Sequence, residues 1–439
     1  MSKSNSKILS ALSLRFDIKS KIFTNTVWLL FDKIFRFFTN FIISIWIARF
    51  LGPDNFGILS YAQAFTTLFM YFATLGLDNI VIRNIVNKSM DTNTVLGSAF
   101  VLKIAGGIIT FFTINVVYFL MAKELSTTFW LIVIISFGMI FQCFDTIGFW
   151  YQAQVKSKKF IIAKDIALAI STILKILLII SKGSLITFAF FSVLEVLIGG
   201  FLLVLIYRRD GESLRKWKYE SETAKRLLKD SWPLIFSGMA IMIYMRIDQI
   251  MIQKFLGSAA VGVYTAATKL SESWYFIPTA IAASTFPSII EAKKVSESLY
   301  YEKLKKLLLI LVAMAYAVSI VITFSADYII NLFYGIEYQE SAMVLTIHIW
   351  ASAFVFVQIA TGSWFINENL QLMAFYRNFI GAIGNILLNL YTIPKYGIVG
   401  AAIGTIVSYA LVVVFPMLYS PSYRKISRLI FSAFILKRR

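Results

Sequence analysis

The chain contains almost none of the residues that build disulfide frameworks and metal centres. Its 439 residues include one cysteine, Cys143, and one histidine, His348. A disulfide needs two cysteines, and a clustered zinc site needs several Cys or His ligands, so both are excluded and no cofactor is expected. We expect Cys143 to be an ordinary core residue. His348 either donates a hydrogen bond to a neighbouring helix or relays protons, and both interpretations stay open.

The sequence also lacks a phosphate-binding loop and any long polar segment. No G-x-x-x-x-G-K-[ST] motif is present, which excludes nucleotide binding of that type. The longest connections between apolar runs are about 25 residues, too short for an independent soluble domain. The chemistry of this protein must therefore take place within its apolar segments.

Apolar residues dominate the chain instead. They make up 59% of the sequence and the mean hydropathy is +0.76, whereas roughly 45–50% is usual for a soluble domain. A helix of about 20 apolar residues crosses the hydrocarbon core of a bilayer. Twelve such segments occur, and the first is too long and too charged for a cleaved signal peptide. They lie at residues 24–48, 56–77, 95–120, 128–150, 161–180, 185–206, 232–252, 259–289, 305–324, 342–366, 373–393 and 397–419. The sequence predicts an all-α polytopic membrane protein with about 12 transmembrane helices.

The distribution of basic residues predicts the orientation. Most of the 42 Lys and Arg residues lie on one side of this topology, with the two termini. The other side has five, which are Arg49, Lys123, Lys182, Lys254 and Lys395. The positive-inside rule then places both termini in the cytoplasm. Basic loops beside anionic lipids account for the net charge of +19, so no nucleic-acid partner is expected.

A short internal repeat divides the chain into two halves. The sequence FLGPDNFG at residues 50–57 recurs as FLGSAAVG at residues 255–262, and a W-x-L motif precedes each copy. Each copy joins the first and second spans of a six-span half. Because six is even, the halves cross the membrane in the same direction, related by an axis along the membrane normal, and such transporters carry substrate between the halves. The predicted parts are a basic cytoplasmic tail (1–23), an N-lobe (24–206), a basic inter-lobe loop (207–231), a C-lobe (232–420) and a second basic cytoplasmic tail (421–439).

Several charged residues lie inside the predicted spans, where each costs about 2.5–3.5 kcal/mol. We predict a cationic cavity, formed by Lys33, Arg36, Arg246 and Lys269. Three acids are assigned to ion coupling or charge balance: Asp32, Asp248 and Glu272. Helical spacing allows Asp32 to pair with Arg36, and Lys269 with Glu272. Arg246 and Asp248 face apart on one helix, so their partners must come from other helices.

The alternative is a purely structural role for these charges. In that interpretation the two spaced pairs neutralise themselves, and Arg377, Lys164 and Lys175 extend to the membrane edges. A cationic cavity would instead suit an anionic head group, and a guanidinium fork suits phosphate oxygens.

Other polar and aromatic residues are predicted to contact sugar, or else to pack or anchor at the interface. The residues with possible sugar contacts are Gln63, Thr67, Tyr71 and Thr74 at helical spacing, and the aromatic or amide residues Trp150, Tyr151, Gln152, Trp274 and Tyr275. Residues 325–341 are predicted to form a short interfacial helix.

Four segments resemble one transporter family. They are WIARFLGPDNFGILSYAQAF, GLDNIVIR, YMRIDQIMIQKFLGSAAVGVYTAATKL and PKYGIVGAAIGTIVS. Together they resemble the Wzx-type polysaccharide transporters of the multidrug/oligosaccharidyl-lipid/polysaccharide flippase superfamily, over nearly the whole chain. The resemblance implies two lobes that open alternately and carry an undecaprenyl-diphosphate-linked oligosaccharide, such as an O-antigen unit, across the bacterial inner membrane, using an ion gradient. Implied partners are membrane lipids, a glycan polymerase and chain-length proteins.

The resemblance assigns the R-I-D motif to Arg246 and Asp248, and the next helix to Lys269. Lys33 and Arg36 lie in the charged part of the first span. Relatives often have a cation in the second span, whereas residues 56–77 contain none. Two other functions remain: a cation-coupled drug exporter, for which an acidic or neutral cavity is expected, and a membrane glycan polymerase or ligase, which usually carries a large outer loop. The charge pattern favours the transporter of anionic lipid-linked sugar, which is not an enzyme.

Overall fold

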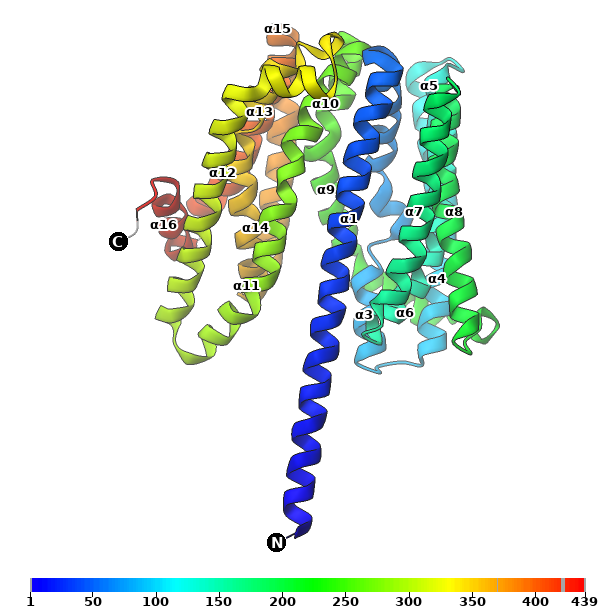
Figure 1. The fold of residues 1–439 in the computed structure, drawn as a ribbon, viewed down its shortest axis with the longest axis vertical. Coiled ribbons are helices and arrows are strands. Elements are labelled where there is room, and N and C mark those ends of the chain that lie inside the picture. Colours follow the sequence, from blue (N-terminus) through cyan, green and yellow to red (C-terminus); the bar gives the residue numbers. More distant parts are fainter. Residues whose placement is uncertain (1, 369, 420–422, 438–439) are drawn as a thin grey trace. The chain divides into compact units, whose positions relative to one another are not determined.

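The computed structural model describes residues 2–368, 370–419 and 423–437, and their regular elements are all helices (Figure 1). The side chains of residues 1–23, which form the predicted basic N-terminal tail, lie outside the description. By length and hydropathy, seven of the described helices are suited to cross a membrane, or eight if the bent pair at residues 341–362 is one span. The predicted class, an all-α polytopic membrane protein, is confirmed.

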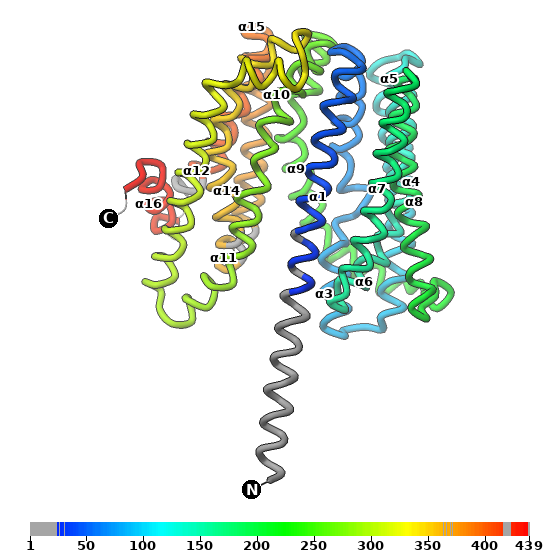
Figure 2. The backbone as a smooth tube through the Cα atoms, in the orientation of Figure 1, coloured from blue at the N-terminus to red at the C-terminus, as the bar shows by residue number. Residues whose placement is uncertain are grey.

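The twelve predicted segments all lie on helices, although two helices contain two segments each. Helix α1 (Ser2–Leu68) is kinked at Gly52, and α15 (Gln371–Tyr419) is kinked at Gly397. Both glycines have positive φ angles, 70° and 59°, which other residues rarely adopt. After Gly52 the chain reverses direction, as the tube in Figure 2 shows.

The sequence repeat is also a structural repeat. In the second copy the chain bends at Gly257 (φ 88°, ψ −178°), between α9 (Ser221–Leu256) and α10 (Ser258–Glu272). The corresponding Gly52 has φ 70° and ψ 172°, so the glycine of both F-L-G motifs has the same conformation. Each F-L-G motif therefore ends one helix and starts the next.

The contacts divide the chain into two compact units. Unit 1 contains residues 1–40 and 70–235, and unit 2 contains residues 41–69 and 236–439. The first half of α1 and the first part of α9 belong to unit 1, and their remainders belong to unit 2. The second span, predicted as part of an N-lobe, packs with unit 2 up to Phe69.

Unit 1 is a helical bundle in which α7 packs along α8 and α4 along α5 (Figure 1). Besides its parts of α1 and α9, unit 1 contains the helices α2 (Met70–Thr74), α3 (Asp78–Val86), α4 (Thr92–Ala122), α5 (Thr127–Ile140), α6 (Asp145–Ala153), α7 (Ser157–Ile180) and α8 (Leu185–Arg209). It also has 3-10 turns at Phe141–Phe144 and Leu214–Lys216. Cys143 is buried in this bundle, as expected for a core residue. The helix that precedes α2 ends at Leu68, so the helical face predicted through Gln63, Thr67 and Tyr71 is interrupted.

Unit 2 has its largest core between α11, α12, α14 and α16. The bounds of these and the remaining helices are α11 (Phe276–Val295), α12 (Glu297–Phe333), α13 (Ser341–His348), α14 (Ala351–Asn367) and α16 (Tyr423–Phe434), with 3-10 turns at Ser273–Tyr275 and Ile336–Tyr338. The predicted interfacial helix at residues 325–341 is wrong: α12 continues to Phe333, and only a 3-10 turn follows. Helix α12 continues past the polar residues Ser325 and Asp327, which had suggested that the long helix ends before them.

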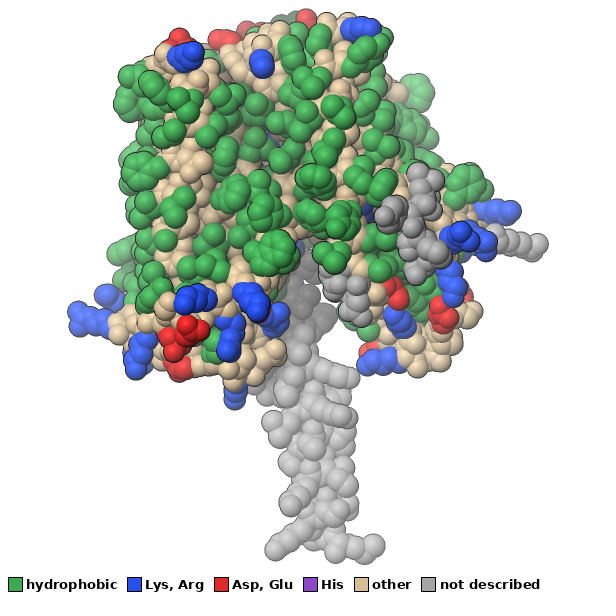
Figure 3. All heavy atoms as spheres, turned by 180° about the vertical axis from the view of Figure 1, so that it is seen from behind, with side chains coloured by type: hydrophobic (Ala, Val, Ile, Leu, Met, Phe, Trp, Pro, Cys, Tyr) green, Lys and Arg blue, Asp and Glu red, His purple; other side chains and the backbone are tan. Residues whose placement is uncertain are grey.

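Apolar side chains cover the flanks of the helices, while Lys and Arg side chains gather near helix ends (Figure 3). Among the most exposed are Ile109 at 65%, Phe112 at 61% and Leu120 at 66% on α4, and Phe324 at 88% on α12. A soluble protein rarely exposes such a continuous apolar surface. Lipid is its expected surrounding.

The two copies of the repeat touch each other through glycine within unit 2. A Cβ atom on Gly57 would lie 1.8 Å from the carbonyl oxygen of Ser258, and one on Gly262 would lie 2.0 Å from that of Pro53. Pro53 and Gly57 correspond to Ser258 and Gly262 in the repeat, so the contact is symmetric. Two backbones approach this closely only because neither glycine has a side chain.

Candidate functional site

A small polar pocket lies in unit 2 between the second half of α1, α9 and α10. Its volume is about 140 Å³. The residues that line it are Ser60, Gln63, Ala64, Thr67, Arg246, Gln249, Thr265 and Lys269. The lining contains two cations and no carboxylate. The structure thus brings together two of the four predicted cavity cations, Arg246 and Lys269, and two of the predicted sugar contacts, Gln63 and Thr67.

Arg246 directs its guanidinium group at a carboxylate on the next helix. Its two terminal nitrogens donate to the Oε1 and Oε2 atoms of Glu272, over 3.4 and 3.2 Å. The expected partner of Arg246 on another helix is therefore found, and it is the acid that helical spacing had assigned to Lys269. In this conformation the fork holds two oxygens of a carboxylate, the same arrangement that it offers to a phosphate group.

Lys269 reaches back to the second half of α1. Its Nζ atom donates to the Ser44 hydroxyl over 2.7 Å and lies 5.0 Å from the centre of the Phe56 ring. A hydroxyl group and an aromatic face both help to hold an ammonium group in position. These contacts fix the second cation of the pocket beside Arg246 and Gln63.

Asp248 points to the opposite side of α9 from Arg246 and is 3% exposed. Its carboxylate accepts hydrogen bonds from the Tyr264 hydroxyl, from the Thr405 hydroxyl at 3.3 Å and from the Gln249 backbone N–H at 3.0 Å. The two hydroxyl donors come from α10 and α15, as expected for partners on other helices, and the backbone donor is the next residue of α9. A buried carboxylate held by hydroxyl groups can exist charged or protonated, so its role in coupling remains a prediction.

His348 is buried on α13, where its Nδ1 atom lies 2.9 Å from the Ser271 hydroxyl. The edge of its ring approaches the Tyr264 ring, with centres 6.3 Å apart. This contact matches the structural interpretation, a hydrogen bond to the neighbouring helix. Whether His348 also relays protons stays a prediction.

A second group of charges lies within unit 1 and is acidic. Arg36 contacts Asp32 at 2.7 Å, as helical spacing predicted, and also Asp165 at 3.1 Å and Glu195 at 3.8 Å. Lys175 approaches Glu195 at 3.8 Å. Three carboxylates thus gather around Arg36, with Lys175 as a second cation beside them.

Arg36 and Lys33 therefore have different surroundings in unit 1. Arg36 is enclosed by three carboxylates, whereas the Lys33 side chain is exposed. Whether they form a cavity with Arg246 and Lys269 of unit 2 stays a prediction. Sequence reasoning did not find Asp165, although it lies four residues after Ile161 within an apolar run, where a carboxylate is itself a signal.

Two of the three basic residues expected to extend to the membrane edges are buried instead. Arg377 is 5% exposed and stacks on the Phe365 ring at 4.2 Å, and Lys175 is 8% exposed. For these two the prediction is wrong. Lys164 is partly buried and pairs with Asp145, and its extension to the edge stays a prediction.

Two of the predicted sugar contacts are also placed by the structure. Tyr151 is 0% exposed and donates to Asp210 over 2.9 Å, and Trp150 packs against Tyr207. Both belong to a packed core of unit 1 rather than to a cavity. Tyr71 lies in unit 1, apart from the pocket residues Gln63 and Thr67.

Comparison with known families decides the identity of the chain. The model of the polysaccharide biosynthesis protein family matches residues 22–293. The chain belongs to this family. The resemblance to polysaccharide transporters seen in the sequence motifs is thereby confirmed.

Named relatives of the family share low identity over most of the chain. A putative O-antigen transporter of Shigella dysenteriae is 22% identical, covering 85% of this chain and 94% of its own length. The capsular polysaccharide biosynthesis protein CapF of Staphylococcus aureus is 23% identical, covering 84% and 91%.

Solved membrane transporters show a similar fold. The lipid II flippase MurJ, in an inward closed conformation, matches with a TM-score of 0.68 at 15% identity, over 94% of this chain and 91% of its own. An inward-facing multidrug resistance transporter of the MATE family matches with a TM-score of 0.63 at 15% identity, over 90% and 95%. At this identity the likeness concerns the fold alone.

Proposed function

We propose that this member of the polysaccharide biosynthesis protein family is a flippase for an undecaprenyl-diphosphate-linked oligosaccharide, such as an O-antigen repeat unit. The relatives named as a putative O-antigen transporter and as a probable low-salt glycan biosynthesis flippase support a lipid-linked glycan as the substrate class. Alternating access of two lobes would move it from the inner to the outer leaflet. The glycan polymerase and chain-length proteins are its proposed partners, and the reaction breaks no covalent bond.

The pocket with Arg246 and Lys269 carries this proposal. Its two cations and absence of carboxylates suit a diphosphate, and Gln63 and Thr67 add neutral hydrogen-bonding groups. Its volume of about 140 Å³ is well below the roughly 300–1,000 Å³ that drug-sized ligands occupy. In this conformation it would therefore hold the charged group of the lipid rather than the sugars.

The same pocket separates the proposal from its rivals. A cation-coupled drug exporter would bind its substrates through acidic or neutral groups, whereas two cations repel them. A membrane polymerase or ligase needs a place for its chemistry outside the bilayer. The described connections between helices are short turns, the longest of which joins α8 to α9.

The proposed location is the bacterial inner membrane, with both termini in the cytoplasm. The charge census supports this orientation, because Arg208, Arg209, Lys293 and Lys294 lie at helix ends on the side of the predicted cytoplasmic loops.

Deletion of the gene tests the function directly. We expect labelled lipid-linked oligosaccharide to accumulate on the cytoplasmic side of inverted vesicles and surface glycan to be lost. Purified protein in liposomes should restore its movement to the other leaflet, measured by the access of an added glycosidase. An unchanged distribution between leaflets, with and without the protein, would contradict the proposal.

We further propose that protons drive transport through the carboxylates around Arg36, with Asp165 as the group that is exchanged. In this view Asp165→Asn imitates the protonated, uncharged state and should reduce accumulation driven by a pH gradient about tenfold, while exchange without a gradient continues. The reason is that the amide oxygen can still accept from Arg36, but the amide cannot gain or lose a proton. The measurement is glycolipid transport in liposomes with and without an imposed pH difference.

Two matched variants complete this test. Glu124→Gln removes an exposed acid in the turn between α4 and α5 and should leave the gradient response intact. Asp248→Asn examines the other predicted coupling acid, in unit 2. If gradient-driven transport is lost only in Asp248→Asn, coupling belongs to Asp248 and the role of Asp165 is refuted.

A further inference from the structure

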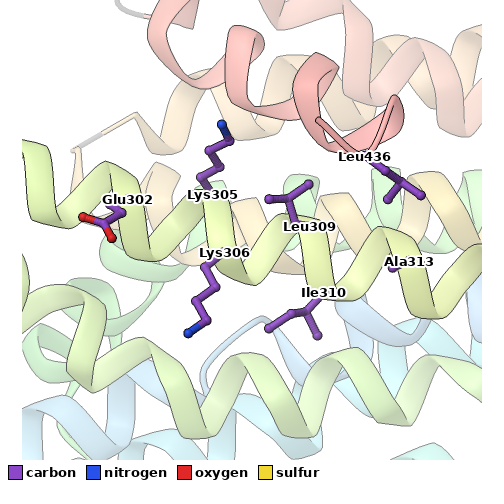
Figure 4. A pocket seen from close by; sticks show the side chains of 7 residues that line it. All are labelled: Glu302, Lys305, Lys306, Leu309, Ile310, Ala313 and Leu436. Carbon is purple, nitrogen blue, oxygen red and sulfur yellow. The ribbon is translucent and has the colours of Figure 1, made fainter. Parts of the chain in front are cut away.

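A groove lies on the outer flank of unit 2, beside α12 and the segment that follows α16 (Figure 4). Its volume is about 560 Å³, four times that of the polar pocket. The residues that line it are Glu302, Lys305, Lys306, Leu309, Ile310, Ala313 and Leu436. Charged residues occupy one end and apolar residues the rest, so the groove has the polarity of a lipid molecule.

The charged end lies where α12 enters its apolar segment. Lys305 and Lys306 directly precede the run LLLILVAMAYAVSIVITF, which extends to residue 324. At 1.5 Å per residue, those 18 residues span about 27 Å, close to the hydrocarbon thickness of a bilayer. The two ammonium groups are therefore at the depth of lipid head groups, and the groove continues from them into the hydrocarbon.

Leu436 forms the other wall, and the helix that precedes it, α16, is strongly amphipathic. Tyr423, Ile426, Ile430 and Ala433 are buried against unit 2 at spacings of three and four residues. The helix is fixed on α12 at both ends, since Lys425 pairs with Glu297 at 2.8 Å and the Tyr316 hydroxyl donates to the Phe434 carbonyl over 3.1 Å.

The outward face of α16 combines cations with apolar side chains. Arg424, Arg428 and Lys437 are exposed, and so are Phe431 at 66% and Ile435 at 56%. Such a face lies in the plane of a membrane interface rather than in water. The groove thus opens toward lipid, at an interface that is rich in positive charge.

We propose that this groove binds one anionic phospholipid, with its phosphate at Lys305 and Lys306 and an acyl chain along Leu309, Ile310, Ala313 and Leu436. Figure 4 shows the two lysine side chains directed to opposite sides of α12, and both are among the residues that line the groove. Glu302, at the same charged end, offsets one of the two charges and favours a singly charged phosphodiester over a more anionic group. The bound phospholipid belongs to the cytoplasmic leaflet of the membrane. This assignment rests on the proposed orientation.

Charge distinguishes this occupant from others. A neutral phospholipid would gain nothing from the lysines, and a peptide helix would need a longer apolar surface than the four residues available. The carried glycolipid is a different ligand, because its diphosphate is assigned to the pocket of Arg246 and Lys269. The groove is thus a site for a permanent lipid of the membrane and not part of the transport path.

Native mass spectrometry of the purified full-length chain tests the site. With phosphatidylglycerol as the probe, we expect one lipid to be retained, and phosphatidylcholine to be retained much less. The double variant Lys305→Gln/Lys306→Gln should weaken phosphatidylglycerol binding about thirtyfold, since each lysine near an anionic lipid contributes roughly a fivefold factor. Inorganic phosphate at equal concentration should not displace the lipid, which separates a lipid site from a phosphate site.

The control removes the same charge from a helix end without a groove. Arg208→Gln/Arg209→Gln, at the exposed end of α8, should leave phosphatidylglycerol retention unchanged. A third variant, Ala313→Phe, fills the apolar part and should release the lipid while all charges stay. Equal loss in both charge variants, or full retention in Ala313→Phe, would overturn the proposal. Because the measurement needs no glycolipid, failure of the proposed transport function would leave its outcome unchanged.

Discussion

Replacing Arg246 by alanine should reduce glycan export roughly 100-fold while the amount of protein in the membrane stays close to normal. The expected loss corresponds to one bidentate, charge-assisted interaction with a diphosphate in a site screened from water. Arg246→Lys keeps the charge but loses the fork, so we expect a smaller loss, about tenfold. Surface glycan and membrane-inserted protein are to be measured together, in a strain that lacks its own copy of the gene.

The pairing of Arg246 with Glu272 supplies a sharper control than either single variant. If Arg246 serves only to neutralise Glu272, the double variant Arg246→Ala/Glu272→Gln removes both charges and should restore export. If Arg246 binds the diphosphate, the double variant should insert normally and remain inactive. Restored export in the double variant, or full export by Arg246→Ala, would refute the binding role.

Adding a single methyl group at Gly57 or Gly262 should disable the transporter. Each new Cβ atom would lie 2.0 Å or less from a backbone carbonyl oxygen of the partner helix, so the two repeat helices must separate. Overpacking of this kind costs roughly 1–3 kcal/mol, which lowers the population of this conformation about 5- to 150-fold. We expect Gly57→Ala and Gly262→Ala each to lower both surface glycan and the midpoint of thermal unfolding.

The symmetry of the contact gives a second, independent result. Once Gly57→Ala has separated the helices, the same separation accommodates Gly262→Ala, so the double variant should lose less stability than the sum of the two. The control is Gly362→Ala on α14, where an added Cβ atom meets nothing within 4 Å. Additive losses, or wild-type behaviour of Gly57→Ala, would show that this close approach is not required.

The sequence predicts the helices well because hydrocarbon allows little else. Every backbone polar group in a span must be satisfied within its own segment, so an apolar run of sufficient length is a helix whatever its neighbours are. Breaks within helices are less visible. Gly52 and Gly257 were found through the repeated F-L-G motif, whereas Gly397, in the sequence KYGIVG, has no second copy.

Partners of charged residues were predictable only along one helix. The spacing of Asp32 and Arg36 gives the observed pair, since four residues place both on one face. Lys269 and Glu272 have a comparable spacing, yet Glu272 pairs with Arg246 because a guanidinium on the adjacent helix offers two hydrogen bonds instead of one. Asp165 and Glu195 join Arg36 from other helices, and no local pattern encodes which helices become neighbours.

Membership of residues 41–69 in unit 2 has a consequence for how the chain can be divided. The chain passes between the units three times, after Asn40, after Phe69 and after Ile235. A cut beside the exposed Gly211 would therefore not release two self-sufficient domains, because the first fragment would retain a pair of helical segments that complete the second unit. If the two halves were translated separately, we expect each to fold fully only when the other is present, because each half carries helical segments that belong to the other unit.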